Sequence, residues 1–172
     1  MMRDSQRSRV YRAERAVPWG SCGRPLTGPE FCQWIQVLVN APYVQALVPP
    51  PRARPDGTPA SSLIPPIRVK VGGRKRFGAA ASYYPEPRIT CSLSSARAWV
   101  AVHELAHHVT RLQIDRQKRQ DPGHGPLFCR NYLEIVRGAF GHWLAVRLEQ
   151  EFGSFRVHVA LATSVPRGAV VA

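Results

Sequence analysis

The sequence predicts an α+β fold, and three patterns of apolar residues indicate it. Apolar residues recur at helical spacing from 28 to 40, alternate with polar residues in three short segments between 67 and 93, and return to helical spacing from 95 to 152. A helix followed by a group of strands and then by further helices is the order typical of α+β domains. The 172 residues amount to one domain with short appendages. A chain of this size buries roughly 70% of its unfolded surface, so it can support a core without disulfides.

Composition excludes several classes of protein. Apolar residues make up 44% of the chain and charged residues 20%, which is typical of a globular protein. No stretch approaches the roughly 20 apolar residues of a membrane span, and residues 1–7 lack the apolar segment of a secretory signal. No CxxC pair is present, which excludes a zinc ribbon and argues against a disulfide scaffold; the cysteines are Cys22, Cys32, Cys91 and Cys129. We therefore expect a reduced, cytoplasmic protein.

The net charge of +13 makes nucleic acid, DNA in particular, a candidate partner. Arginine accounts for 21 of the 24 basic residues, and the chain is also rich in alanine, proline, valine and glycine. A GC-rich genome imposes this bias through its codons whatever the function, and the charges form no long run. Charge alone therefore leaves contact with DNA open, and the sequence does not determine the oligomeric state.

The two ends of the chain are expected to lie outside the main domain. Residues 1–26 are rich in arginine and end in a cluster of prolines and glycines, which predicts a basic N-terminal arm. Residues 153–172 are expected to form a C-terminal tail, in which apolar residues at 155–161 alternate as in a strand. The main domain is therefore assigned to residues 27–152.

The main domain begins with a helix and a long loop. Thr27 and Glu30 are spaced as a capping box, in which Thr27 accepts a hydrogen bond from the Glu30 amide while Glu30 reaches back. The helix that follows, 28–40, has an apolar face made of Phe31, Trp34, Ile35, Leu38 and Val39. Residues 49–66 hold seven prolines in eighteen positions. This predicts an extended loop, because proline fixes φ and removes a hydrogen-bond donor.

Three strands are expected after this loop. Residues 67–71 alternate apolar and basic side chains, which is the period of a half-buried strand. A pair of glycines then turns the chain into a second strand of small residues at 77–84. In the third strand, the apolar residues that alternate with polar ones are Ile89, Cys91 and Leu93.

The rest of the main domain is expected to be helical. One helix runs from about 95 to 112, with Ser94 or Ser95 as its N-cap. A glycine followed by a proline starts the next helix, at about 126–137. Two further glycines separate that helix from the last one, 140–152.

An HExxH motif, His103-Glu104-Leu105-Ala106-His107, lies on the first of these helices. Residues four apart lie one helical turn from each other on the same face, so His103 and His107 can present two imidazole nitrogens to one zinc ion. Glu104 can reach a metal-activated water without being a ligand. The opposite arc of the helix is apolar and is expected to face the core; it consists of Trp99, Val102, Leu105, Ala106, Val109 and Leu112.

A catalytic zinc ion needs a third protein ligand and an open fourth position. His124 is the best candidate because sixteen residues separate it from His107 and it lies just before a helix; Glu134 on that helix is the alternative. Glu104 would then accept a proton from the activated water and pass it to the leaving amine. Three tyrosines are available to polarise the oxyanion, and the sequence does not choose among Tyr132, Tyr83 and Tyr84.

The other histidines are expected to play no part in this site. His108 lies about 100° around the helix from His107, on the side away from the apolar arc, which predicts a surface position. His142 and His158 have no motif partners. The cysteines are expected to be small core residues rather than ligands.

Two segments carry a family resemblance: HELAHHV at 103–109 and GHGPLF at 123–128. Together they resemble the signature of the SprT-like zinc metallopeptidases, which include the Spartan-type proteases. The opening RDSQRSRVYRAER at 3–15 and the total length resemble a set of small metallohydrolases of actinobacteria and their phages that share this core. The resemblance implies a zincin-like fold over 27–152, with His103, His107 and His124 as zinc ligands and Glu104 as general base. For Spartan-type relatives it implies cleavage of DNA-bound proteins.

The chain departs from the family pattern at two points. Leu127 stands where the family has a glutamate, which removes a polar group close to the expected site. No cysteine cluster follows the domain in this sequence, so we do not expect the zinc ribbon of some members.

The sequence therefore predicts a zinc-dependent metallopeptidase that hydrolyses a protein or peptide bound in extended form along a strand. Two alternatives stay open. One is a nucleic-acid-binding protein with a structural zinc, in which the arm at 1–26 and the basic turn at 72–76 contact phosphates. The other is a metal-dependent hydrolase of a non-protein substrate.

Overall fold

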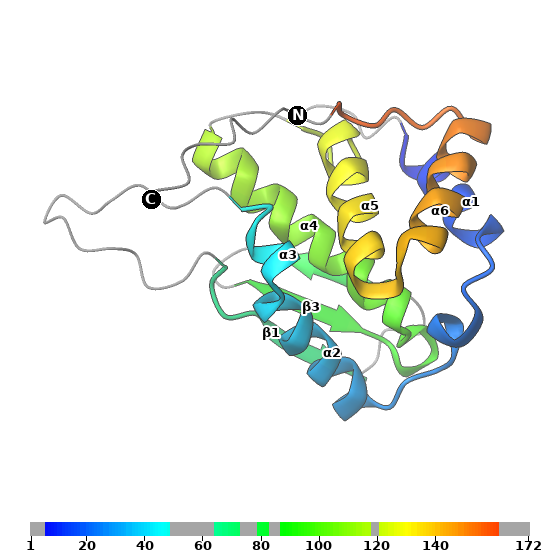
Figure 1. Cartoon of the computed structure of the whole chain (residues 1–172). Helices are drawn as coiled ribbons and strands as arrows, with labels where there is room; N and C mark the ends of the chain where they lie inside the picture. The colour runs from blue at the N-terminus through cyan, green and yellow to red at the C-terminus, as the bar shows by residue number, and fades with distance from the viewer. Residues whose placement is uncertain (1–5, 49–63, 73–78, 83–86, 118–120, 162–172) are drawn as a thin grey trace, which may run out of the picture.

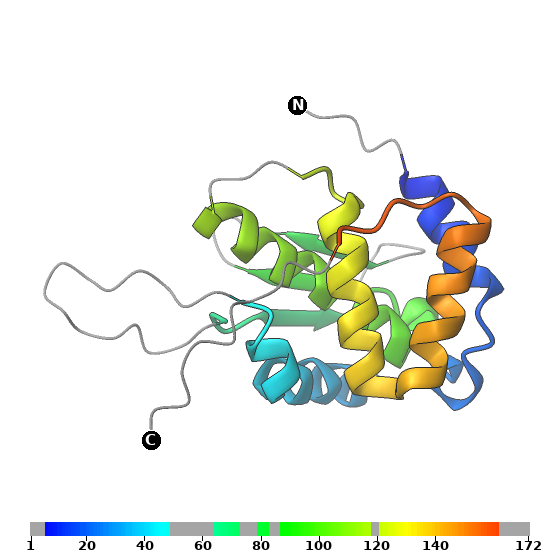
Figure 2. The same cartoon turned by 45° about the horizontal axis from the view of Figure 1, so that its top comes forward.

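A long central helix, α4 (Ala98–Gln117), organises the fold in the computed structural model (Figure 1). The structure describes residues 6–48, 64–72, 79–82, 87–117 and 121–161. Helix α4 packs against the sheet and α2 on one side and against α5 on the other, and α6 and α1 follow beyond α5 (Figures 1 and 2). These helices are α1 (Arg7–Ala16), α2 (Gly28–Asn40), α5 (Pro126–Phe140) and α6 (His142–Ser154). The short α3 (Pro42–Gln45) packs against α2 and α5.

The sheet has three strands in the order β1-β3-β2. Strand β1 (Arg68–Val71) runs parallel to β3 (Arg88–Cys91), and β2 (Ala79–Ser82) runs antiparallel to β3. The predicted α+β architecture with a small three-stranded sheet is thus confirmed. The third strand ends earlier than expected, however. Leu93 lies in the 3₁₀ helix η2 (Leu93–Ser95) with 60% of its surface exposed, so its predicted place on the buried face of the strand is wrong.

Helix α2 begins at the predicted capping box. The Thr27 amide donates to Glu30 Oε2 at 2.7 Å, and the Glu30 amide donates to Thr27 Oγ1 at 3.3 Å. The hydrogen bond from the Thr27 backbone is the main reason that the pKa of Glu30 falls to about 2. The buried face of α2 consists of Phe31, Ile35, Leu38 and Val39, as expected, whereas Trp34 is only partly buried.

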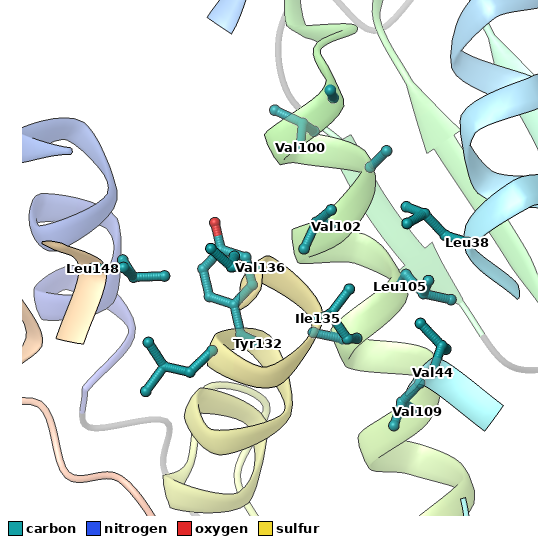
Figure 3. Close-up of a cluster of buried hydrophobic side chains, with 14 of the residues drawn as sticks. Leu38, Val44, Val100, Val102, Leu105, Val109, Tyr132, Ile135, Val136 and Leu148 are labelled. Atoms are coloured by element: carbon teal, nitrogen blue, oxygen red, sulfur yellow. The ribbon is translucent and has the colours of Figure 1, made fainter. Parts of the chain in front are cut away.

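Helix α4 is buried on several sides at once. Leu105 and Val109 face α2 and α3, while Val102 faces α5 (Figure 3). The predicted apolar arc is confirmed at Val102, Leu105, Ala106 and Val109, but Trp99 and Leu112 are only partly buried. The helix starts at Ala98, so the predicted N-caps are wrong: Ser94 and Ser95 belong to η2.

A buried polar network ties α4 to α5. Asn131 Nδ2 donates to Thr110 Oγ1 at 2.9 Å and to Gln113 Oε1 at 2.8 Å. Gln113 in turn donates to the carbonyl oxygen of Leu47, beyond the end of α3. Buried polar groups of this kind are costly unless they are paired, so the network fixes the position of α5 along α4.

The predicted break between the last two helices is at the second glycine only. Helix α5 continues through Gly138 to Phe140, and Gly141, with φ of +93°, ends it. Gly138 has a different role: a Cβ atom there would lie 2.3 Å from Cδ2 of Tyr43 on α3. The absence of a side chain therefore allows α3 to pack closely on α5.

Both ends of the chain differ from expectation. Within the predicted basic arm, Arg7–Ala16 form helix α1, which packs against α6 and buries Val10 and Ala13 completely. Residues 155–161 form no strand; they run back over the start of α5, where the Ala160 amide donates to the Pro126 carbonyl oxygen at 3.0 Å.

Parts of the predicted elements lie outside the described residues. They are most of the proline-rich loop, most of the basic turn at 72–76, and both ends of the predicted second strand. None of the helices in the described ranges has the length and apolar character that crossing a bilayer requires.

Replacing Gly138 by alanine tests the contact between α3 and α5. Alanine at an exposed helix position normally gains about 1 kcal/mol over glycine. Here the Cβ atom would meet the Tyr43 ring, so we expect Gly138→Ala to lower the free energy of unfolding by about 1–3 kcal/mol in urea denaturation. In a Tyr43→Ala background the same change should stabilise the protein. A stabilising effect in the wild-type background would contradict the packing described.

Candidate metal centre

Three histidines from two segments come together beside α4. His103 and His107 lie on α4, and His124 lies in the loop before α5; their ligand nitrogens are all within 4.8 Å of one another. The Nε2 atoms of His103 and His107 are 3.2 Å apart. Two nitrogens bound to one tetrahedral zinc ion at about 2.0–2.1 Å lie roughly 3.3 Å apart. The donor types and the spacing on α4 therefore fit zinc.

Phe128 packs against the histidines. Its ring stacks on His107 with centroids 4.3 Å apart and meets the edge of His124 at 5.0 Å. Burial lowers the pKa of His107 well below its usual range, and the charges of His103 and His124 lower it further. His107 is therefore held as a neutral imidazole, which is the form that binds metal.

His124 is positioned by a tight turn and by a distant glutamine. The Gly125 amide donates to the Pro122 carbonyl oxygen at 2.8 Å, and a Cβ atom on Gly125 would collide with the Asp121 carboxylate. Gln6, at the start of α1, is buried and donates to the His124 carbonyl oxygen at 2.6 Å. The loop that carries His124 is thus held both by its own turn and by Gln6.

His103 is oriented by a carboxylate that the sequence did not reveal. Its Nδ1 atom hydrogen-bonds Glu14 on α1, and the two residues are 4% and 2% exposed. A carboxylate only accepts, so Nδ1 carries the proton and Nε2 keeps its lone pair for a ligand bond. Burial lowers the pKa of His103, but the charge of Glu14 and its hydrogen bond outweigh burial, and the net shift is upward.

A cavity of about 460 Å³ opens beside His103. Glu104, His103 and Tyr11 of α1 contribute to its wall. The Tyr11 ring stacks on His103 at 5.7 Å and meets His124 edge-on at 5.1 Å. Burial raises the pKa of Tyr11, while its hydrogen bond with Arg7 acts in the opposite direction. Tyr11 is not among the three tyrosines that the sequence offers as candidates.

The structure also separates the alternatives proposed from sequence. Glu134 lies away from the histidine cluster on α5, where it pairs with Arg137 at 2.7 Å. Tyr132 is fully buried behind His103, with ring centroids 5.5 Å apart, and burial followed by the charge of Glu14 raises its pKa well above the usual range. Tyr83 and Tyr84 lie outside the described residues.

The predicted surface position of His108 is wrong. Its side chain is 3% exposed and lies with Ile67 and Pro87 around a small cavity on the sheet side of α4. Burial lowers the pKa of His108 to about 4, although a hydrogen bond with the backbone of Arg88 opposes the shift. His142 and His158 are exposed, in keeping with their lack of motif partners.

Helical spacing was the signal that could have revealed Glu14 and Tyr11. Val10, Ala13 and Val17 recur at intervals of three and four residues, and all three are buried.

The arrangement as a whole offers three imidazole nitrogens, an adjacent carboxylate and a cavity that admits a ligand. No family model, curated protein or solved structure matches the chain.

Proposed function

We propose that this chain is a zinc-dependent metallopeptidase with a zincin-like, SprT-like catalytic domain. The observation that carries the proposal is the grouping of His103, His107 and His124, of which His103 lines one cavity together with Glu104. Three protein ligands with an open position are typical of catalytic zinc sites, whereas structural sites have four ligands. Among the described residues no fourth histidine, cysteine or carboxylate completes the group.

Bound zinc would supply a Lewis acid that lets water lose a proton near neutral pH. Glu104 is 5% exposed and lies in the cavity wall next to His103, which suits a general base. It would accept the proton and later deliver it to the leaving amine. Tyr11 faces the same cavity and would donate a hydrogen bond to the carbonyl oxygen of the substrate.

The edge of the sheet offers a place for the substrate backbone. Strand β2 is at the end of the sheet order and packs next to α4. An extended peptide could add to this edge through main-chain hydrogen bonds, which would bring its own backbone alongside the metal helix.

The cysteines bear on the compartment in which the protein works. All four cysteines are free thiols, which favours a reducing compartment such as the cytoplasm.

A Glu104→Gln variant separates metal binding from catalysis. Because Glu104 is expected to move a proton rather than to hold the metal, the variant should bind zinc with wild-type stoichiometry. Its cleavage of a casein substrate should fall by about 10²–10⁴-fold. Zinc is measured by elemental analysis and cleavage by intact mass.

Two further variants serve as controls for that experiment. His124→Ala should lose both zinc and activity, whereas His142→Ala, an exposed histidine on α6, should lose neither. A zinc-loaded Glu104→Gln protein that cleaves as fast as wild type would contradict the proposal. Cleavage of a nucleic acid or an ester in place of protein would support the non-protein alternative.

Glu14→Gln tests how far the buried carboxylate supports the metal. Glutamine can still accept a hydrogen bond from His103 but carries no charge. We expect zinc affinity to drop 10–100-fold, as is usual when the partner of a metal-binding histidine is changed. Chelator competition measures the affinity, and circular dichroism checks the fold. Glu149→Gln, on the exposed face of α6, is the matched control. Unchanged zinc affinity in a folded Glu14→Gln protein would refute this role.

Tyr11→Phe tests the proposed hydrogen bond to the substrate carbonyl. The phenylalanine ring can still stack on His103, so zinc affinity should stay the same. The turnover number should fall by about 10²-fold, because a hydrogen-bond donor to the developing oxyanion is lost. Steady-state kinetics on a fluorogenic peptide will give kcat and KM separately. A change in KM alone would assign Tyr11 to substrate binding instead.

A further inference from the structure

The cavity beside Glu104 is lined by more positive than negative groups. Three arginines contribute to its wall: Arg7 and Arg15 from α1, and Arg97 from the residue before α4. The two carboxylates in the wall already have roles, since Glu14 binds His103 and Glu104 is the proposed base. The cavity therefore has the electrostatic character of a site for an anionic group.

Arg97 is held in place by the backbone around it. Its Nε atom donates to the Gly23 carbonyl oxygen at 3.0 Å, and Nη1 donates to the Ser94 carbonyl oxygen. Its own backbone forms a bridge with Pro25. A guanidinium group has five N–H donors, so the Nη2 end keeps donors for a ligand. The geometry is that of a pre-organised arginine, which loses little freedom when it binds.

The guanidinium groups of Arg97 and Arg15 are not used in ion pairs within the part of the chain that the structure describes. Arg15 is exposed at the last turn of α1, across the same cavity. Arginine binds carboxylates with paired, charge-assisted hydrogen bonds. Trp99 and Val100 add an apolar wall that can contact the aliphatic part of a side chain.

We propose that this cavity binds a carboxylate of the peptide substrate next to the scissile bond, with Arg97 and Arg15 as specificity determinants. The inference rests on the proposed peptidase function and adds a substrate class to it: acidic peptides. A volume of about 460 Å³ is in the range of small-ligand pockets and suits one or two residues. A nucleic-acid strand would instead need an extended basic groove.

Binding is measured by calorimetry on zinc-loaded Glu104→Gln protein, so that no probe is cleaved. The probes are a blocked alanine pentapeptide with a central glutamate, its glutamine counterpart, and an alanine pentapeptide with a free C-terminus. We expect the glutamate probe to bind on the order of tenfold more tightly than the glutamine probe. The free C-terminus distinguishes a terminal carboxylate from a side-chain carboxylate as the preferred group.

Arginine variants test which side chains cause the preference for the glutamate probe. Adding Arg97→Gln or Arg15→Gln should each remove most of the preference for the carboxylate and leave binding of the glutamine probe unchanged. Arg15 makes no hydrogen bond to the fold among the described residues, so its variant remains informative if Arg97→Gln fails to fold. Arg12→Gln removes the same charge from an exposed position of α1 outside the cavity wall and should have no effect.

Three results would overturn the inference: equal binding of the glutamate and glutamine probes, equal losses in Arg12→Gln and Arg97→Gln, or tight binding of a thymidine oligonucleotide that Arg97→Gln abolishes. Cleavage of the same blocked probes by zinc-loaded wild type distinguishes the two proposals. Cleavage without preference removes the inference and leaves the peptidase. Carboxylate preference without cleavage leaves the binding site and removes the peptidase.

Discussion

The buried hydrogen bond between Glu14 and His103 joins the N-terminal helix to the metal helix, and the site depends on it. A buried carboxylate is costly unless it is paired, so the pairing with His103 favours docking of α1 at this position. Docking of α1 then places Gln6 on the His124 carbonyl oxygen and Tyr11 over the histidines. One contact between residues far apart in sequence thus orients three of the groups around the site.

The histidine cluster also requires that α4, which carries His103 and His107, is held in place. Its apolar side chains pack against α2, α3 and α5, and the Asn131 network sets the register with α5. Because His124 precedes α5, that register also sets the distance from His124 to the histidines of α4. The packing of the core therefore also determines the geometry of the histidine cluster.

Structural features that depend on residues close together in the chain could be predicted from the sequence. The capping box at Thr27 is confirmed, because it depends on spacing within a short segment. The structure brings His103 and His107 together with His124 and not with Glu134, and their binding of zinc stays a prediction. Glu14 escaped prediction because its partner is 89 residues away and arginines around it suggested an exposed arm. His108 was misplaced because a single apolar arc was assumed, whereas α4 is covered on several sides.

The most direct test of the account is the zinc X-ray absorption spectrum of the metal-loaded wild-type protein. The account predicts a first shell of nitrogen and oxygen scatterers at about 2.0–2.1 Å, with three imidazole rings and one oxygen from water. A sulfur scatterer at about 2.3 Å would mean a cysteine ligand, and a fourth imidazole would mean a closed site. Either result would contradict the proposal that His103, His107 and His124 hold a catalytic zinc ion.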